Sequence, residues 1–348
     1  MILKEFLELR RDRRTMAMII ALPLLLLVVF GYAANFTVDD VPTRVYGPNA
    51  QAVAGKLHTP FDVKKVDPAG TEEQARDVLR SQDAGAVVVA PSSGPATVFI
   101  DGSNLFSAQS VTAASKASGG VLQPEVLFNP ELKTSWTMVP ALVGMIMAFI
   151  GTIITAIGLV RERQAGTLEQ LAVMPFKATD VIVGKIAPYF VLAAFDMVLV
   201  TVLGCLLFGV PFAGSFLVLA LGAALFLFCV LGIGVLISSV SQNQGQAMQM
   251  ALLTLMPQML LSGMIFPLSA MAAGVRWIGY LFPLTYFNMV SNGVMLRDAP
   301  ISSLALPLGL LAGMAVLVFS FAVLRFRRDL APTAPKAARD AVAAGGTR

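Results

Sequence analysis

Long, predominantly apolar stretches limit what this chain can fold into more than any other feature of its sequence. Each is about twenty residues or longer, which is enough for an α-helix to cross the apolar core of a lipid bilayer. Only 13% of the residues are charged, against about a quarter in typical soluble proteins. The sequence therefore predicts an α-helical polytopic membrane protein with six transmembrane helices. The expected spans are residues 15–34, 136–160, 181–208, 216–239, 246–266 and 304–324.

Residues 35–134 differ in character from the rest of the chain. They hold eight basic and eleven acidic residues together with the single histidine, His58, so this segment is not expected to lie in lipid. Short β-branched runs alternate with helical patterns, and this alternation predicts an inserted small α/β domain. The expected strands are 43–46, 61–66, 86–90 and 97–101, and the expected helices are 49–57, 71–80 and 103–118.

Basic residues beside the apolar stretches set the expected orientation, because Lys and Arg concentrate on the cytoplasmic side of membrane spans. Segment 1–14 is basic, and an arginine-rich sequence, RFRR, follows the last span, so both ends are expected in the cytoplasm. Residues 35–134 are then extracytoplasmic, and residues 331–348, rich in Ala, Pro and Gly, are expected to form a disordered cytoplasmic tail. A cleaved signal peptide is the competing interpretation of 15–34, but that run exceeds the usual apolar region of about 7–15 residues.

Residues 267–300 complicate the count of spans. They are mostly apolar, but Pro283 interrupts them and they carry Arg276, Arg297 and Asp298. A seventh span here would place the arginine-rich end of the chain outside, against the orientation rule. We therefore expect a pair of short helices that enter the outer face of the membrane and return. The expected membrane domain covers residues 135–330 and holds five of the six spans.

Residues 161–190 form the most charged part of this membrane domain. Thr167 can cap a helix whose first turn holds Glu169, where a carboxylate complements the helix dipole. Pro175 then ends that helix. The pattern predicts a short amphipathic helix within 161–175 that lies along the cytoplasmic surface and faces an aqueous partner. An ordinary cytosolic loop is the alternative interpretation of these charges.

Several ordered motifs resemble those of one transporter family. They are RERxxGTLEQL at 161–171, Pro175, GKxxPY at 184–189, SQNQGQAMQ at 241–249, LLSG at 260–263 and FPLTYF at 282–287. These motifs, and the order of one span, a large outer domain and five further spans, resemble the permease subunits of type 2 ABC transporters. The resemblance covers nearly the whole chain. Gln164 and Ala165 depart from it, because a third charge is commoner there.

The resemblance implies an ATP-driven exporter of drugs, lipids or other amphiphiles in the cell membrane. Two permease subunits, identical or different, would pair with two ABC ATP-binding subunits and contact membrane lipid. Segment 161–175 would be the coupling helix, and the second and fifth spans would line a path at the dimer axis. The expected coupling residues are Arg161, Glu162, Arg163, Gly166, Thr167, Leu168, Glu169 and Gln170.

The chain itself is not expected to be an enzyme. A phosphate-binding loop needs the pattern GxxxxGK[ST]. The chain has two Gly-Lys pairs, Gly55–Lys56 and Gly184–Lys185. Both lack the Ser or Thr that must follow, and both lack the glycine five positions before the pair. We therefore expect no cofactor in this chain, with ATP and Mg bound by the partner subunit. A single histidine disfavours a His-based metal site. The net charge of +4 clusters at segment ends and indicates topology, not nucleic-acid binding.

Three polar residues are candidates for the transport path. Asp196 is the only acidic residue well inside an expected span, and Gln246 and Gln249 begin the fifth. A buried carboxylate is unfavourable in lipid and should face protein or water. The alternative interpretation is structural: a packing hydrogen bond for Asp196 and a solvated turn for the glutamines.

Two other functional classes compete with the exporter. An ion-coupled secondary transporter or channel would use Asp196 as its ion site, but no inverted repeat is visible in the sequence. A membrane-anchored sensor would bind a ligand through the outer domain, although six spans exceed what anchoring requires. Co-purification with an ATP-hydrolysing partner would separate the exporter from both.

Overall fold

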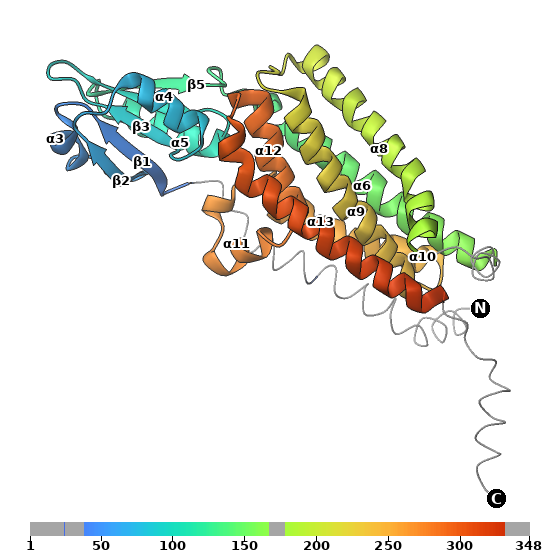
Figure 1. The fold of residues 1–348 in the computed structure, drawn as a ribbon. Helices are drawn as coiled ribbons and strands as arrows, with labels where there is room; N and C mark the ends of the chain where they lie inside the picture. The colour runs from blue at the N-terminus through green and yellow to red at the C-terminus, as the bar shows by residue number, and fades with distance from the viewer. Residues whose placement is uncertain (1–23, 25–37, 167–177, 331–348) are drawn as a thin grey trace, which may run out of the picture.

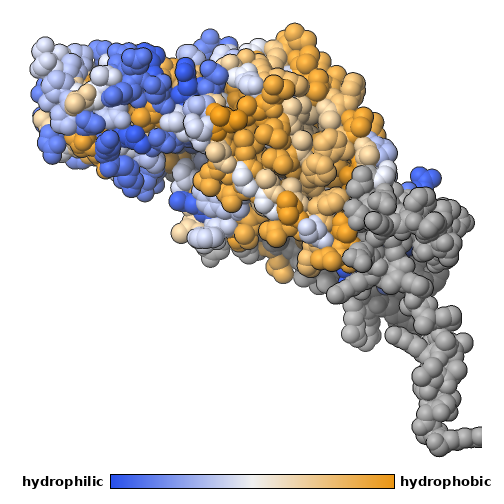
Figure 2. Space-filling view, viewed as in Figure 1, coloured by the Kyte–Doolittle hydropathy of each residue, from blue (hydrophilic) through white to orange (hydrophobic). Residues whose placement is uncertain are grey.

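The structure, a computed structural model, describes residue 24, residues 38–166 and residues 178–330. An α/β domain lies at one end of an elongated molecule, and long helices extend away from it side by side (Figure 1). Hydrophilic residues cover much of the α/β domain, whereas hydrophobic residues dominate the surface of the helices (Figure 2). This contrast suits one part in water and another in lipid. The expected first span, apart from Leu24, and the expected tail lie outside the described residues.

The α/β domain contains a five-stranded sheet with strand order β2-β1-β3-β4-β5. Strand β1 runs parallel to β2 and β3, β4 is antiparallel to β3, and β5 is parallel to β4. The strands are β1 Val41–Tyr46, β2 Phe61–Asp67, β3 Ala86–Val89, β4 Ala96–Asp101 and β5 Leu122–Leu127, and the helices are α3 Ala50–Ala54, α4 Glu72–Arg80 and α5 Leu105–Ala117.

Helices cover both faces of this sheet, because successive side chains of a strand point to opposite faces. Val88 of β3 belongs to a core cluster with Ala108 and Val111 of α5. Its neighbour Val87 belongs to a second cluster with Leu79 of α4. The continuous apolar run of β3 is therefore explained by burial on both sides.

The strands and helices expected in this domain are confirmed, with small changes at their ends. The capping box expected at Thr71 is also present: its Oγ1 accepts a hydrogen bond from the Gln74 amide at 3.3 Å, and Gln74 Oε1 accepts one from the Thr71 amide at 3.1 Å. Strand β5 was not among the expected strands, and its pattern LQPEVL contains Pro124. The structure places β5 at the edge of the sheet, where a proline is tolerated.

Four described helices are long and apolar enough to cross a membrane: Thr134–Gln164, Ile186–Phe208, Phe216–Val240 and Ile301–Arg325. They correspond to the expected second, third, fourth and sixth spans. The helices of this part of the chain are α6 Thr134–Gln164, α8 Ala178–Phe208, α9 Phe216–Val240, α10 Gln244–Leu261, η1 Leu268–Ala270, α11 Ala273–Gly279, α12 Pro283–Arg297 and α13 Ile301–Leu330.

Helix α6 is the centre of the bundle and packs against α8, α9, α10 and α12. Three of its glycines each receive a side chain from a different helix: Phe287 of α12 lies over Gly144, Val230 of α9 over Gly151, and Tyr189 of α8 over Gly158. Small residues allow such close approach between helices in lipid. These side chains occupy the space that a Cβ atom would need.

The fifth span expected over residues 246–266 is not confirmed. Helix α10 has only 18 residues and ends at Leu261, and the next turn contains Gly263 at a φ of +84°. Helix α10 is also not among the described helices that are long and apolar enough to cross a membrane. Three glutamines, Gln246, Gln249 and Gln258, lower the hydropathy of this segment.

Two short helices, α11 and α12, follow in place of a seventh span, as expected. Pro283 is the first residue of α12, a position where its missing N–H costs nothing. With 15 residues, α12 is about 22 Å long, which is shorter than the apolar core of about 30 Å in a bilayer. Their location in the outer face of the membrane remains a prediction.

We predict that Gly144→Leu destabilises the bundle. A Cβ atom at residue 144 would lie 2.4 Å from a ring carbon of Phe287, and such overpacking typically costs about 1–3 kcal/mol. Thermal unfolding of the purified chain, followed by size-exclusion chromatography, should show a lower midpoint. Gly313→Leu is the matched control, because nothing lies within 4 Å of a Cβ at that position. Equal midpoints for the two variants would contradict the packing argument.

Candidate coupling end and transport path

The end of α6 carries the first charges of the expected coupling segment. Helix α6 continues through Arg161, Glu162 and Arg163 to Gln164, and Gly166 then adopts a φ of +73°. A left-handed residue just after a helix is typical of a helix end and favours glycine. Residues 161–164 therefore complete α6, four residues beyond the end expected for the second span, whereas the amphipathic helix expected after Thr167 lies outside the described residues.

Four expected coupling residues lie in the part of the chain that the structure leaves undescribed. They are Thr167, Leu168, Glu169 and Gln170. Of the remaining four, Arg161 is exposed, whereas Glu162, Arg163 and Gly166 are half-buried. The described part of the coupling segment is thus one helix end with a polar surface.

The end of α6 is tied to the turn between α9 and α10. Arg163 Nη1 donates a hydrogen bond to the carbonyl oxygen of Ser241 at 3.1 Å. Gln244 Nε2 donates to Gln164 Oε1 at 3.3 Å. These contacts join residues about 80 positions apart, so the SQNQGQ motif and the RERQAG motif belong to one structural unit.

The turn itself is held by side-chain caps. Asn243 Oδ1 accepts a hydrogen bond from the Gln246 amide at 2.9 Å, which caps α10. Gln246 Oε1 accepts in return from the Gln242 amide at 3.1 Å, and the Gln246 side chain is buried, with 5% of the residue exposed. Gln246 therefore orders the turn, which favours the structural interpretation of this residue over a path-lining role.

Asp196 lies in the middle of α8. This helix runs antiparallel to α6, since Tyr189 lies over Gly158 and Val139 lies against Gly204. Asp196 falls between these two contacts and is half-buried. Its Oδ2 atom is buried and has no hydrogen-bond partner among the described residues, so the packing hydrogen bond of the structural interpretation is not present within this part of the chain.

Gln249 also has a buried oxygen, Oε1, for which the described residues offer no hydrogen-bond partner. The structure does not bring it together with Asp196, however. Helix α10 packs chiefly on α6, whereas α8 packs on α6 and α9 and makes no substantial contact with α10. The three residues expected to line a single path therefore do not form one cluster within the described chain.

A polar cavity at the opposite end of the bundle was not expected from the sequence. It lies between the α/β domain and the helices, and Asn288 and Asn292 of α12 contribute to it. The signal was available: two asparagines four residues apart in an apolar segment share one helix face. The proline and the charges of residues 267–300 pointed to topology, and nothing in the sequence showed that these asparagines would meet the α/β domain.

The apolar helices around α6, the water-exposed α/β domain and the polar helix end define the class of a polytopic membrane protein. The comparisons with known proteins then give the family. Residues 13–324 match the sequence profile of the family described as ABC-2 family transporter protein. The chain belongs to this family, as the motif resemblance predicted.

Three relatives from Escherichia coli (strain K12) illustrate the similarity. The probable multidrug ABC transporter permease YbhS is 29% identical over 94% of this chain and 96% of its own length. The probable multidrug ABC transporter permease YbhR is 26% identical over 86% of this chain and 89% of its own. The inner membrane transport permease YhhJ is 31% identical over 60% of this chain and 56% of its own.

We predict that Arg163→Ala loosens the turn between α9 and α10. The substitution removes the hydrogen bond to the Ser241 carbonyl, and a hydrogen bond from a charged donor is typically strong enough to change local opening about ten-fold. Hydrogen–deuterium exchange of residues 241–246 should accelerate by that factor. Arg161→Ala, at an exposed position on the same helix end, should leave the exchange unchanged. Equal exchange in both variants would show that Arg163 does not hold the turn.

Proposed function

We propose that this chain is the membrane-spanning permease subunit of an ATP-driven ABC exporter. The observation that carries the proposal is the family match over residues 13–324, supported by relatives whose names describe multidrug ABC transporter permeases. The sequence has no phosphate-binding loop, so ATP and Mg would be bound by a separate ATP-binding subunit. The cargo is a drug, a lipid or another amphiphile.

We propose six spans for the complete membrane domain. The four apolar helices supply the second, third, fourth and sixth. Residues 15–34 form the first span, and α10 together with the turn that follows it forms the fifth span. This count puts both termini in the cytoplasm and the α/β domain outside, which agrees with the basic residues at the two ends of the chain.

The coupling proposal rests on the charged segment after α6. Residues 167–175 are proposed to form the helix that contacts the ATP-binding subunit. The end of α6 and the turn before α10 would attach this helix to the membrane bundle. The hydrogen bonds of Arg163 and Gln164 with this turn support the proposal, because a displacement of the coupling segment then acts on α6, α9 and α10 together.

The transporter is proposed to contain two permease subunits and two ATP-binding subunits. Helices α6 and α10 would line the path between the two permeases, as the family resemblance implies. The unpartnered Oε1 of Gln249 on α10 supports a polar lining there. A homodimer and a heterodimer are both compatible with this arrangement.

A secondary transporter that uses Asp196 is the second candidate function. The observation in its favour is the buried, unpartnered carboxylate oxygen in the middle of α8. Because a deep charge without a partner is unfavourable in lipid, a bound cation is one way to stabilise it. A transporter of this kind would work without an ATP-hydrolysing partner.

We predict that Glu169→Arg abolishes ATP-driven transport while the protein still inserts in the membrane. The substitution reverses a charge in the segment proposed to contact the ATP-binding subunit, and a like-charge contact is repulsive where the wild-type pair attracts. Transport by the complete complex in vesicles is the measurement. Glu73→Arg, on the exposed face of α4, is the matched control. Normal transport by the Glu169 variant would argue against coupling through this segment.

We predict opposite membrane sides for Lys56 and Lys177. Lys56 is exposed on the α/β domain and should react with a membrane-impermeant amine reagent added to intact spheroplasts. Lys177 should react only after permeabilisation, because the coupling segment is proposed to face the cytoplasm. Mass spectrometry of the labelled peptides separates the two sites. Labelling of Lys177 in intact spheroplasts would overturn the orientation.

A further inference from the structure

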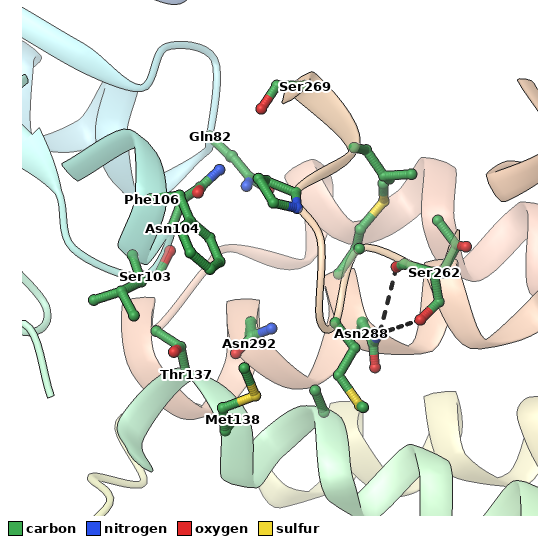
Figure 3. Close-up of a pocket in the computed structure, with 18 of the residues that line it drawn as sticks. Gln82, Ser103, Asn104, Phe106, Thr137, Met138, Ser262, Ser269, Asn288 and Asn292 are labelled. Carbon is green, nitrogen blue, oxygen red and sulfur yellow. Dashed lines mark hydrogen bonds between the residues drawn. The ribbon is translucent and has the colours of Figure 1, made fainter. Parts of the chain in front are cut away.

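A cavity of about 280 Å³ lies at the junction of the α/β domain and the membrane helices. Its walls come from three directions (Figure 3): Asn104 and Phe106 belong to the α/β domain, Thr137 to the start of α6, and Asn288 and Asn292 to α12. Small-molecule sites are concave spaces of this order that combine apolar walls with a few polar groups. Both parts of the protein therefore contribute to one binding space.

The floor of the cavity presents two hydrogen-bond acceptors. Asn288 Nδ2 donates to the carbonyl oxygen and the hydroxyl of Ser262 at 3.4 and 3.3 Å (Figure 3), and these contacts hold the amide in one orientation. Within the described part of the chain, its Oδ1 atom has no hydrogen-bond partner, and neither does Oδ1 of Asn292. The two asparagines are four residues apart, so their side chains lie on one face of α12.

Arg297, at the end of α12, supplies donors to the same cavity. The residue is 2% exposed, and its Nη1 lies 3.6 Å from Oδ2 of Asp101 at the end of β4. This pair balances the charge, but Nε and Nη1 still lack a hydrogen-bond partner in residues 38–166 and 178–330. Buried polar groups are nearly always hydrogen-bonded in native proteins, so three residues around one cavity that each keep an unpartnered polar atom within the described chain indicate a ligand.

The lining also defines the character of that ligand. Among the described residues that line the cavity, Arg297 carries the single charge, and Asp101 offsets it. Met138, Met264 and Met289 lie beside the polar groups, and methionine side chains adapt to apolar groups of different shape. The cavity thus offers donors, acceptors and a flexible apolar surface without net charge.

We propose that this cavity binds an uncharged amphiphile whose polar head carries hydroxyl groups. One hydroxyl can donate to each asparagine oxygen, and hydroxyl oxygens can accept from the Nε and Nη1 atoms of the arginine, so a head with at least two hydroxyls satisfies all four atoms. The short apolar tail lies against the methionines. The site holds the ligand between the outer domain and α12, apart from the proposed coupling end.

The test uses the full chain in lipid nanodiscs and needs neither ATP nor a partner subunit. The probe is an octanoyl monoacylglycerol that carries a diazirine, and cross-linked peptides are identified by mass spectrometry. Labelling should concentrate on residues 285–297 and 137–141, and unlabelled octanoyl glycerol should compete with it. Octanoate and octylammonium at the same concentration should compete poorly, because the site has no net charge.

Asn292→Leu and Asn292→Ser are the test variants. Each removes an amide acceptor, which should reduce labelling about five-fold, the effect of losing one hydrogen bond; the serine variant adds no bulk and keeps the test valid if the leucine variant misfolds. Ser302→Leu is the matched control, because Ser302 is exposed and lies outside the cavity. Labelling that falls evenly on the exposed apolar face of α8, or that both Asn292 variants leave unchanged, would overturn the proposal.

A second arm identifies the source of the ligand. The ATP-binding subunit and Mg-ATP are added to the same nanodiscs after the probe has bound. Labelling that decreases during ATP hydrolysis identifies the ligand as cargo, and constant labelling identifies it as an amphiphile of the bilayer. Both results support the site. The first arm contains no ATP-binding subunit, so labelling of the cavity does not depend on the proposed exporter function. If the cavity binds no amphiphile, labelling fails in the first arm; if the exporter proposal is wrong, labelling succeeds there.

Discussion

The close contact of α6 with its neighbours is the interaction on which the membrane domain depends. Lipid tails are as apolar as leucine side chains, so helices in a bilayer associate through van der Waals packing rather than through exclusion from water. Helix α6 has glycines at positions 144, 151 and 158, where the missing side chain leaves space. Side chains of α12, α9 and α8, respectively, occupy that space. These contacts place α12, α9 and α8 against α6, whereas α13 packs chiefly on α9 and α10 on α6.

Helix α6 also connects the two ends of the molecule. At its start, the buried side chain of Asn129 donates to the Gly102 and Lys133 carbonyls and accepts from the Lys133 amide at 2.9 Å, which ties the sheet to the helix. At its end, Arg163 binds the Ser241 carbonyl. One continuous helix of 31 residues therefore links the α/β domain to the polar helix end.

The candidate site was only partly predictable, for reasons that particular residues illustrate. The charges at 161–163 mark a helix end in the sequence, but their binding to a turn 78 residues away depends on which helices are neighbours. Gln246 is a polar residue at the start of an expected span, but its side chain accepts a hydrogen bond from the Gln242 amide and orders the turn, while Asn243 caps α10. Asn288, Asn292 and Arg297 acquire a shared environment only when α12 packs below the α/β domain.

The sequence by itself determined the membrane class, the α/β insertion, most secondary structure and the family, because hydropathy, periodicity, capping patterns and ordered motifs are local properties of the chain. Tertiary structure alone decided that β5 forms an edge, that α10 ends early and that α12 is a short buried helix. It also decided which polar groups share the cavity at the junction. These features depend on contacts between distant segments, and the free energy of such contacts is not encoded in any single stretch of residues.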